Sequence, residues 1–148
     1  MATLNRRPAT ASDAEFAREV HHRAYQDVVS AQFGGWDEAE QDRFFAETWT
    51  RFGHEILLCD GVPCGYIGID TNTEFIELRE LVILPAFQGR GLGSAILTEL
   101  TARARGAGIP LRLRVLIKNR AVSLYGRFGF RETGVTATHR LMEFDQKL

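Results

Sequence analysis

The first third of the chain repeats its apolar residues at helical spacing. Ser12 and Glu15 have the spacing of a capping box, and the apolar positions after them recur every fourth residue. This pattern predicts a helix over residues 13–30. Its apolar stripe consists of Phe16, Val20, Ala24 and Val28.

A second helical stripe follows the glycine pair at positions 34 and 35. Asp37 with Glu40 offers an N-cap, and Gly53 marks the end of the helix. The apolar residues of this stripe are Phe45, Trp49 and Phe52.

From residue 56 onward the pattern changes to short apolar runs that are typical of strands. Asp60-Gly61 between two such runs predicts a hairpin, and Pro85 stops a longer run. Helical patterns at residues 91–105 and after Asn119 separate the later strands. The predicted strands cover residues 4–7, 56–59, 66–69, 75–84 and 111–117, and two more close the chain between residues 130 and 144.

This order, β-α-α-β-β-β-α-β-α-β-β, predicts an α/β (α+β) fold with a mixed sheet and helices on both faces. The 148 residues favour a single domain over residues 1–148, and 45% apolar with 25% charged residues is typical of a globular protein. No apolar run approaches the roughly 20 residues that span a bilayer, and residues 1–7 lack the apolar core of a secretion signal. We therefore expect a cytoplasmic protein with no membrane partner, in which Cys59 and Cys64 are reduced.

The charge is unevenly distributed. Residues 1–74 contain 6 basic and 13 acidic side chains, whereas residues 75–148 contain 12 and 6. A chance distribution over a solvated surface is one explanation, and an anion handled by the second half is another. Nucleic acid is not expected as that anion, because no nucleic-acid-binding motif accompanies the basic residues.

The most informative segment is the glycine-rich turn that joins the strand at residues 75–84 to the next helix. Gly89, Gly91 and Gly93 lack Cβ atoms where backbone N–H groups can converge at the start of a helix. Such a turn can bind a pyrophosphate, with Arg90 adding charge. The turn lacks the Gly-Lys-Ser/Thr ending of a P-loop and does not match the spacing of a dinucleotide fingerprint.

The segment Gln88-Gly89-Arg90-Gly91-Leu92-Gly93 resembles the Q/R-x-x-G-x-G/A pyrophosphate motif of the GNAT superfamily of acetyl-CoA-dependent N-acetyltransferases. The resemblance covers the chain in order, from the opening strand to a second signature around Asn119. That signature comprises Asn119-Arg120-Ala121, Leu124-Tyr125 and Gly129-Phe130. The resemblance implies a GNAT fold, with a twisted, mostly antiparallel sheet of six to seven strands, about four helices, and a splay between the fourth and fifth strands.

The resemblance also implies the residues that bind acetyl-CoA, the expected co-substrate. Backbone groups of the strand at residues 75–84 would contact the pantetheine arm and the thioester. Backbone N–H groups of the turn would hold the pyrophosphate, and the segment after the fifth strand would contact the pantetheine. The residues concerned are Leu81, Val82, Ile83, Gln88, Gly89, Arg90, Gly91, Leu92, Gly93, Ser94, Asn119 and Tyr125.

Three residues are candidates for catalysis. Tyr125 matches the tyrosine of the second signature, and it would donate a proton to the departing thiolate; packing on a short helix is the alternative role. Glu77 and Glu80 are candidates to take the proton of the acceptor ammonium, directly or through water. Otherwise both are charges on an exposed strand face, paired with Arg79.

In this family the acceptor side is built by the first two helices, their connection and the closing hairpin. Phe33, Trp36 and His139 are therefore candidate acceptor-binding residues, and His21 and His22 could approach the same region. We expect no metal site, because the histidines have no second ligand at a useful spacing.

The sequence thus predicts an acyltransferase that moves the acetyl group of acetyl-CoA to a primary amine by direct attack through a tetrahedral intermediate. A small-molecule amine is the leading acceptor. Branches of the family that acetylate protein N-termini tend to carry a glutamate where this chain has Arg114. Acetylation of a peptide or protein amine and a non-catalytic acetyl-CoA sensor are the alternatives. Dimers are common in the family, which leaves a homodimer open.

Overall fold

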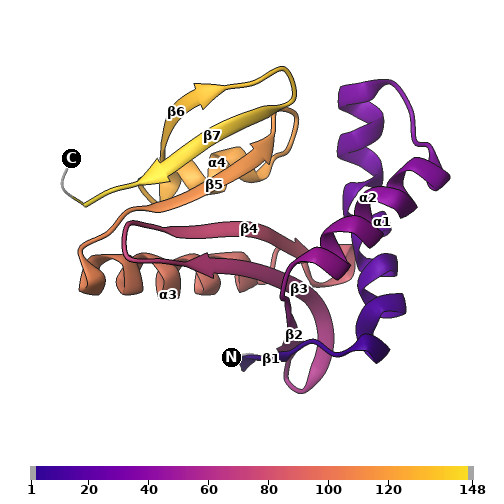
Figure 1. Cartoon of the computed structure of the whole chain (residues 1–148), viewed down its shortest axis with the longest axis horizontal. Helices are drawn as coiled ribbons and strands as arrows, with labels where there is room; N and C mark the ends of the chain where they lie inside the picture. The colour runs from indigo at the N-terminus through magenta and orange to yellow at the C-terminus, as the bar shows by residue number, and fades with distance from the viewer. Residues whose placement is uncertain (1–2, 147–148) are drawn as a thin grey trace. The chain divides into compact units, whose positions relative to one another are not determined.

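The computed structural model describes residues 3–146 and contains seven strands and four α-helices (Figure 1). Short 3-10 turns at Ala11–Asp13 and Pro85–Phe87 precede α1 and α3. Among residues 3–146, no helix combines the length and apolarity needed to cross a bilayer. The elements are β1 (Leu4–Pro8), α1 (Ala14–Phe33), α2 (Glu38–Arg51), β2 (Glu55–Cys59), β3 (Val62–Thr71), β4 (Ile76–Ile83), α3 (Leu92–Ala107), β5 (Leu111–Leu116), α4 (Ala121–Arg127), β6 (Arg131–Val135) and β7 (His139–Phe144).

The strands form one sheet in the order β1-β2-β3-β4-β5-β7-β6. The pairs β1–β2, β2–β3, β5–β7 and β6–β7 are antiparallel, and β4–β5 is parallel. The β4–β5 ladder covers only three residue pairs, Ile76–Leu111 to Leu78–Leu113, although β4 continues to Ile83 and β5 to Leu116. The predicted fold class, a mostly antiparallel sheet that splays between its fourth and fifth strands, is confirmed.

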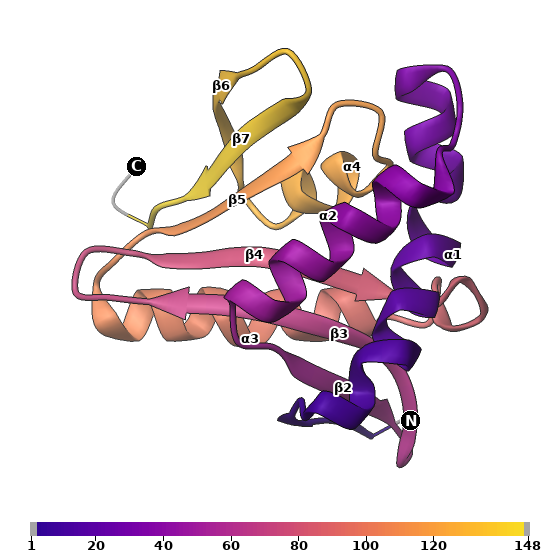
Figure 2. The same ribbon diagram turned by 45° about the vertical axis from the view of Figure 1, so that its right-hand side comes forward.

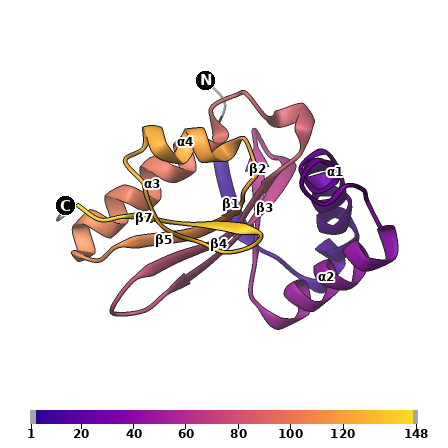
Figure 3. The ribbon, with the colours of Figure 1, turned by 90° about the horizontal axis from the view of Figure 1, so that it is seen from above.

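The chain forms two compact units, and each unit is built from two separate segments of the sequence. The first unit comprises the chain up to Gly68 together with Glu80–Leu92. In it, α1 and α2 lie on one side of β2 and β3 (Figures 2 and 3). Its helices and strands share a buried core, and this burial of apolar area is the main stabilising contribution. The core residues are Ala17, Val20, Phe45, Ile56, Tyr66 and Val82.

The second unit comprises Ile69–Arg79 and Gly93–Leu148. Its helices α3 and α4 lie on the same side of β5 and β7 (Figure 3). A Cβ atom on Gly93 of α3 would lie 3.3 Å from the Leu124 side chain of α4, and Arg105 of α3 stacks its guanidinium on Phe144 of β7. The single-domain prediction for residues 1–148 stays a prediction.

The start of α1 differs from the predicted capping box. Thr10 and Asp13 form the box, since the backbone N–H of Thr10 donates to Asp13 Oδ2 at 2.8 Å, and Ser12 only contacts the Thr10 hydroxyl. Arg7 at the end of β1 donates two further hydrogen bonds to Asp13, at 2.8 and 2.9 Å. The predicted Ser12–Glu15 capping box was wrong, because Arg7 at the end of β1 holds the Asp13 carboxylate beside Thr10.

The other local predictions hold closely. Asp37 caps α2 by accepting from the backbone N–H of Glu40 at 3.0 Å. Asp60 and Gly61 turn between β2 and β3 with φ of 51° and 81°. Phe52 is an exception, because α2 ends at Arg51 and the Phe52 side chain is exposed. Cys59 and Cys64 are free and buried, and burial raises the pKa of the Cys64 thiol to about 11.

Candidate active site

Two glycines of the glycine-rich turn adopt a left-handed backbone conformation. Gly89 and Gly91 have φ of 74° and 80°, a region that L-residues with a Cβ rarely adopt. A Cβ atom at either glycine would meet no other atom within 4 Å, so the space beside both is open. The turn leads directly into Leu92, the first residue of α3. An exposed backbone without side chains at a helix start fits an anion such as a pyrophosphate.

Two side chains of this turn contact neighbouring residues. The amide of Gln88 donates to the carbonyl of Ile83 at 2.8 Å, which ties the turn to the end of β4. The guanidinium of Arg90 stacks on Phe87 with its Cζ 4.9 Å from the ring centre, and Arg90 is exposed. Leu92 is buried, whereas Ser94 in the first turn of α3 is half-buried.

The end of β4 is held against β3 inside the first unit. The backbone N–H of Leu84 donates to the carbonyl of Cys64 at 2.8 Å. Val82 is buried in the core of this unit, and its neighbours Leu81 and Ile83 are half-buried. The backbone of these three residues, the segment predicted to face the coenzyme, is therefore fixed by packing.

Glu80 lies two residues before Val82 and makes a close contact that the sequence did not reveal. Its Oε2 lies 2.7 Å from Nε2 of His54, in the segment between α2 and β2. The side chain of His54 is 2% exposed and that of Glu80 is 19% exposed. Arg79, the alternative partner for the strand carboxylates, pairs with Asp70 at 2.8 Å in the second unit.

Aromatic side chains surround the His54–Glu80 pair. The imidazole of His54 stacks on Trp49 with ring centres 4.6 Å apart, and its edge meets Tyr66 at 5.7 Å. The Tyr66 hydroxyl is buried and has no hydrogen-bond partner among the residues that the structure describes. Burial, and then the charge of Glu80, raises the pKa of Tyr66 well above its ordinary value, so Tyr66 stays neutral.

His21 and His22 also lie in the first unit, on α1. Burial lowers the pKa of His21 to about 4, with a contribution from His22, so His21 is neutral at pH 7. Its Nδ1 lies 3.0 Å from Nδ1 of His22, and Nε2 of His22 lies 2.7 Å from Oδ1 of Asp42 on α2. These contacts join the two helices.

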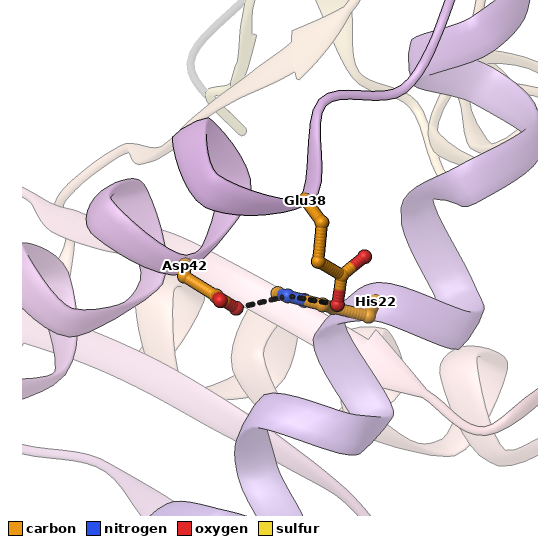
Figure 4. Close-up of side chains that lie close together, drawn as sticks. All are labelled: His22, Glu38 and Asp42. Carbon is orange, nitrogen blue, oxygen red and sulfur yellow. Dashed lines mark hydrogen bonds and ion pairs between the residues drawn. The ribbon is translucent and has the colours of Figure 1, made fainter.

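His22, Glu38 and Asp42 bring three potential metal-ligand atoms within 4.8 Å of one another (Figure 4). Arg18 occupies the same oxygens, since its Nε donates to Asp42 Oδ1 at 2.7 Å and its Nη2 to Glu38 Oε1 at 3.0 Å. The hydrogen bonds from Arg18, followed by that from His22, hold the pKa of Asp42 below its usual value. The guanidinium thus supplies the positive charge that a metal ion would otherwise bring.

The two predicted acceptor residues of the first unit differ in their surroundings. Trp36 donates from Nε1 to Glu38 Oε2 at 2.7 Å and meets the ring of His22 edge-on. Phe33, the last residue of α1, is 54% exposed. Trp36 is therefore fixed beside the His22 cluster, whereas Phe33 presents an aromatic surface to solvent.

In the second unit, Tyr125 is the buried residue of α4. Its ring packs against Phe130 with centres 5.6 Å apart, and burial raises the pKa of its hydroxyl to about 12. Asn119 accepts a hydrogen bond from the backbone N–H of Ala121 at 2.9 Å and so fixes the start of α4. With its raised pKa, the hydroxyl of Tyr125 remains protonated at neutral pH.

Glu77 and His139 also belong to the second unit. Glu77 pairs in register with Arg112 across the β4–β5 ladder. His139 at the start of β7 lies 2.7 Å from the hydroxyl of Thr138, and burial together with the charge of Arg114 lowers its pKa. Of the two candidate carboxylates, Glu80 belongs with Leu81–Ile83 to the first unit, whereas Glu77 does not.

The fold and the glycine-rich turn are those expected of a class of acyltransferases. Comparison with known proteins supports this assignment. Residues 17–130 match the model of the Acetyltransferase (GNAT) family, which is most of the chain. The chain belongs to this family.

Individual relatives agree with the assignment. The chain is 27% identical to an uncharacterized N-acetyltransferase of Methanocaldococcus jannaschii over 90% of its own length and 63% of that protein. It is 35% identical to the N-alpha-acetyltransferase RimI of Mycobacterium tuberculosis over 51% of its own length and 49% of that protein. These curated relatives are thus matched over less than two thirds of their length. The fold is similar to that of the PaiA N-acetyltransferase of Thermoplasma acidophilum in complex with coenzyme A, with a TM-score of 0.77, 19% identity and coverage of 97% and 99%.

Proposed function

We propose that this chain is an N-acetyltransferase that moves the acetyl group of acetyl-CoA to a primary amine. The open turn at Gly89 and Gly91, ahead of α3 and within the residues matched by the family model, is the observation that carries the proposal. The coenzyme A complex of the PaiA N-acetyltransferase adds support through the shared fold. The chain's own residues fit such a ligand, because no atom beyond the adjacent residues lies within 4 Å of a Cβ built at either glycine.

Acetyl-CoA supplies the acetyl group as a thioester that an amine can attack. The backbone from Gln88 to Ser94 binds the pyrophosphate, with Arg90 at its rim. The backbone of Leu81, Val82 and Ile83 orients the pantetheine and offers a main-chain N–H to the thioester carbonyl, a role typically worth about 3–4 kcal/mol. Asn119 fixes the segment before α4 for contact with the pantetheine.

Two side chains handle protons. Glu80 accepts the proton that the ammonium group of the acceptor must lose before its nitrogen can form the new C–N bond. Tyr125 donates its hydroxyl proton to the sulfur as the C–S bond breaks, and its raised pKa keeps that proton in place beforehand. Glu80 is preferred to Glu77 because it lies further along β4, directly before Leu81–Ile83.

A small-molecule amine is the proposed acceptor. Arg114 stands on β5 where family branches that acetylate protein N-termini tend to carry a glutamate, which favours this choice. A peptide or protein amine is the second candidate, and the 35% identity to the N-alpha-acetyltransferase RimI over 79 residues favours it.

The test combines binding with turnover. Calorimetry of the purified chain with acetyl-CoA should show binding, and Gly91→Val should weaken it at least tenfold, because valine disfavours a φ of 80° and fills the open space. Gly106→Ala on α3, where a Cβ meets nothing within 4 Å, is the matched control. Thiol release with a panel of small amines and N-terminal peptides then ranks the acceptors. Binding without turnover of any amine would indicate a sensor, and no binding would overturn the proposal.

A further inference from the structure

The side chain of His54 is buried more deeply than that of its partner, Glu80. It is 2% exposed, and its Nε2 lies 2.7 Å from Oε2 of Glu80, which is 19% exposed. A polar group removed from water must be hydrogen-bonded to avoid a large desolvation cost. The buried imidazole therefore depends on Glu80 for the hydrogen bond of its Nε2 atom.

Both the backbone and the ring of His54 are held in place. Its carbonyl accepts from the backbone N–H of Ala9 at 3.0 Å, directly after β1. Its ring is stacked on Trp49 at an interplanar angle of 19° and is met edge-on by Tyr66. With these restraints the Nε2 atom has little freedom to leave the carboxylate.

Other titratable groups face Glu80 from α1 and β3. Electrostatic effects connect its charge with His21 and Tyr66, and Tyr25 lies in the same region as Tyr66. Burial keeps His21 and Tyr66 neutral near pH 7. The Glu80 carboxylate lies 2.7 Å from Nε2 of His54.

We infer that His54 is a positioning residue, whose Nε2–H donates to Oε2 of Glu80 so that the other carboxylate oxygen is aimed at the acceptor ammonium. The ammonium proton moves to that second oxygen, while the hydrogen bond between Nε2–H and Oε2 stays in place. This role rests on the proposed function, in which Glu80 is the proton acceptor. His54 lies outside the family motifs found in the sequence.

Two substitutions separate the N–H donor from the ring. His54→Phe keeps an aromatic ring against Trp49 and Tyr66 but removes the donor, whereas His54→Gln keeps an N–H near the position of Nε2 and removes the ring. We expect H54F to lower kcat by about 10- to 100-fold, the usual effect of losing a hydrogen bond to a charged group. H54Q should retain a kcat close to that of the unaltered chain.

The coupling to Glu80 is measured with the double variant. Glu80→Gln combined with H54F should be no slower than E80Q alone, because both changes disable the same group. The acetyl-CoA dissociation constant should be unchanged in every variant, and thermal unfolding serves as the folding control. A slow H54Q with an unimpaired H54F would assign the effect to ring packing and overturn the inference, and so would additive losses. If the unaltered chain acetylates no amine, the proposed function fails; if it turns over and H54F is unimpaired, only the role of His54 fails.

Discussion

Gly65 of β3 lies so close to Val82 of β4 that a Cβ atom on the glycine would overlap the Val82 carbonyl oxygen. The next contact of such an atom is the Cα of Ile83 at 3.0 Å. Both obstacles are backbone atoms, which cannot rotate away as a side chain can. Position 65 therefore accepts only glycine if the end of β4 is to keep its path.

Gly65→Ala should consequently lower the free energy of unfolding by about 1–3 kcal/mol, the usual cost of overpacking. It should also weaken acetyl-CoA binding, because the segment it displaces is the one proposed to orient the pantetheine. Chemical denaturation and calorimetry measure the two effects. Gly106→Ala is the control, with an expected gain of about 0.5–1 kcal/mol in its helix. A G65A variant as stable as the unaltered chain would contradict the close approach.

Tyr125→Phe should reduce kcat by about 100-fold or more while leaving thermal stability nearly unchanged. The phenyl ring keeps the packing on Phe130, and only the proton donor is lost. Because burial raises the pKa of Tyr125 to about 12, the donor stays protonated through pH 10, and its contribution should not decline between pH 7 and pH 10. Steady-state rates for both chains across this range provide the measurement. A ratio of the two rates that falls toward one by pH 10 would exclude the hydroxyl as donor.

Asp13→Asn should lower the thermal midpoint at neutral pH. Hydrogen bonds from Arg7, and then from the Thr10 backbone, hold the pKa of Asp13 well below its usual range. The carboxylate is thus ionised in the folded chain at pH values where the unfolded chain is already protonated. Its stabilising contribution is present above about pH 4 and is lost as the pH falls through the folded pKa. The difference between the two chains should therefore shrink from pH 5 to pH 2.

Thermal unfolding at pH 7, 5, 3 and 2 tests this dependence. Asp27→Asn, at an exposed position of α1, is the control and should show no such trend. A difference for D13N that stays constant down to pH 2 would mean that ionisation of Asp13 does not contribute.

Short-range chemistry was predicted well from the sequence. The Asp60-Gly61 turn and the Asp37 cap each depend on residues only a few positions apart. Such features follow from the conformational preferences of glycine and short polar side chains. The glycine-rich turn has the same local origin, and its role as an anion site stays a prediction.

His54 shows why the remainder was missed. Its partner Glu80 is 26 residues away, and neither residue stands in a motif or at a spacing that indicates the other. The two side chains come into contact because the segment after α2 runs beside β4. The tertiary fold sets this path. The sequence also did not indicate that Asp13, and not Glu15, forms the capping box. The tertiary fold decides this too, because the path of β1 brings Arg7 to the Asp13 carboxylate.

Arg18→Ala should turn the cluster of His22, Glu38 and Asp42 into a zinc site. In the unaltered chain the guanidinium donates to the same Asp42 and Glu38 oxygens that lie nearest to His22 Nε2, so a cation would have to displace a charged partner. Without Arg18, one imidazole and two carboxylates within 4.8 Å suit Zn²⁺ with water as a further ligand. Zinc at about 100 times its dissociation constant would then stabilise R18A by about 2.7 kcal/mol.

The measurement is the thermal midpoint with and without zinc, reversed by a chelator. The unaltered chain should show no zinc-dependent rise, and R18A combined with His22→Gln should lose the rise that R18A shows. Since glutamine removes the nitrogen ligand, this double variant distinguishes the cluster from zinc bound elsewhere on the surface. A zinc-dependent rise in the unaltered chain that His22→Gln abolishes would show that the guanidinium does not block the cluster.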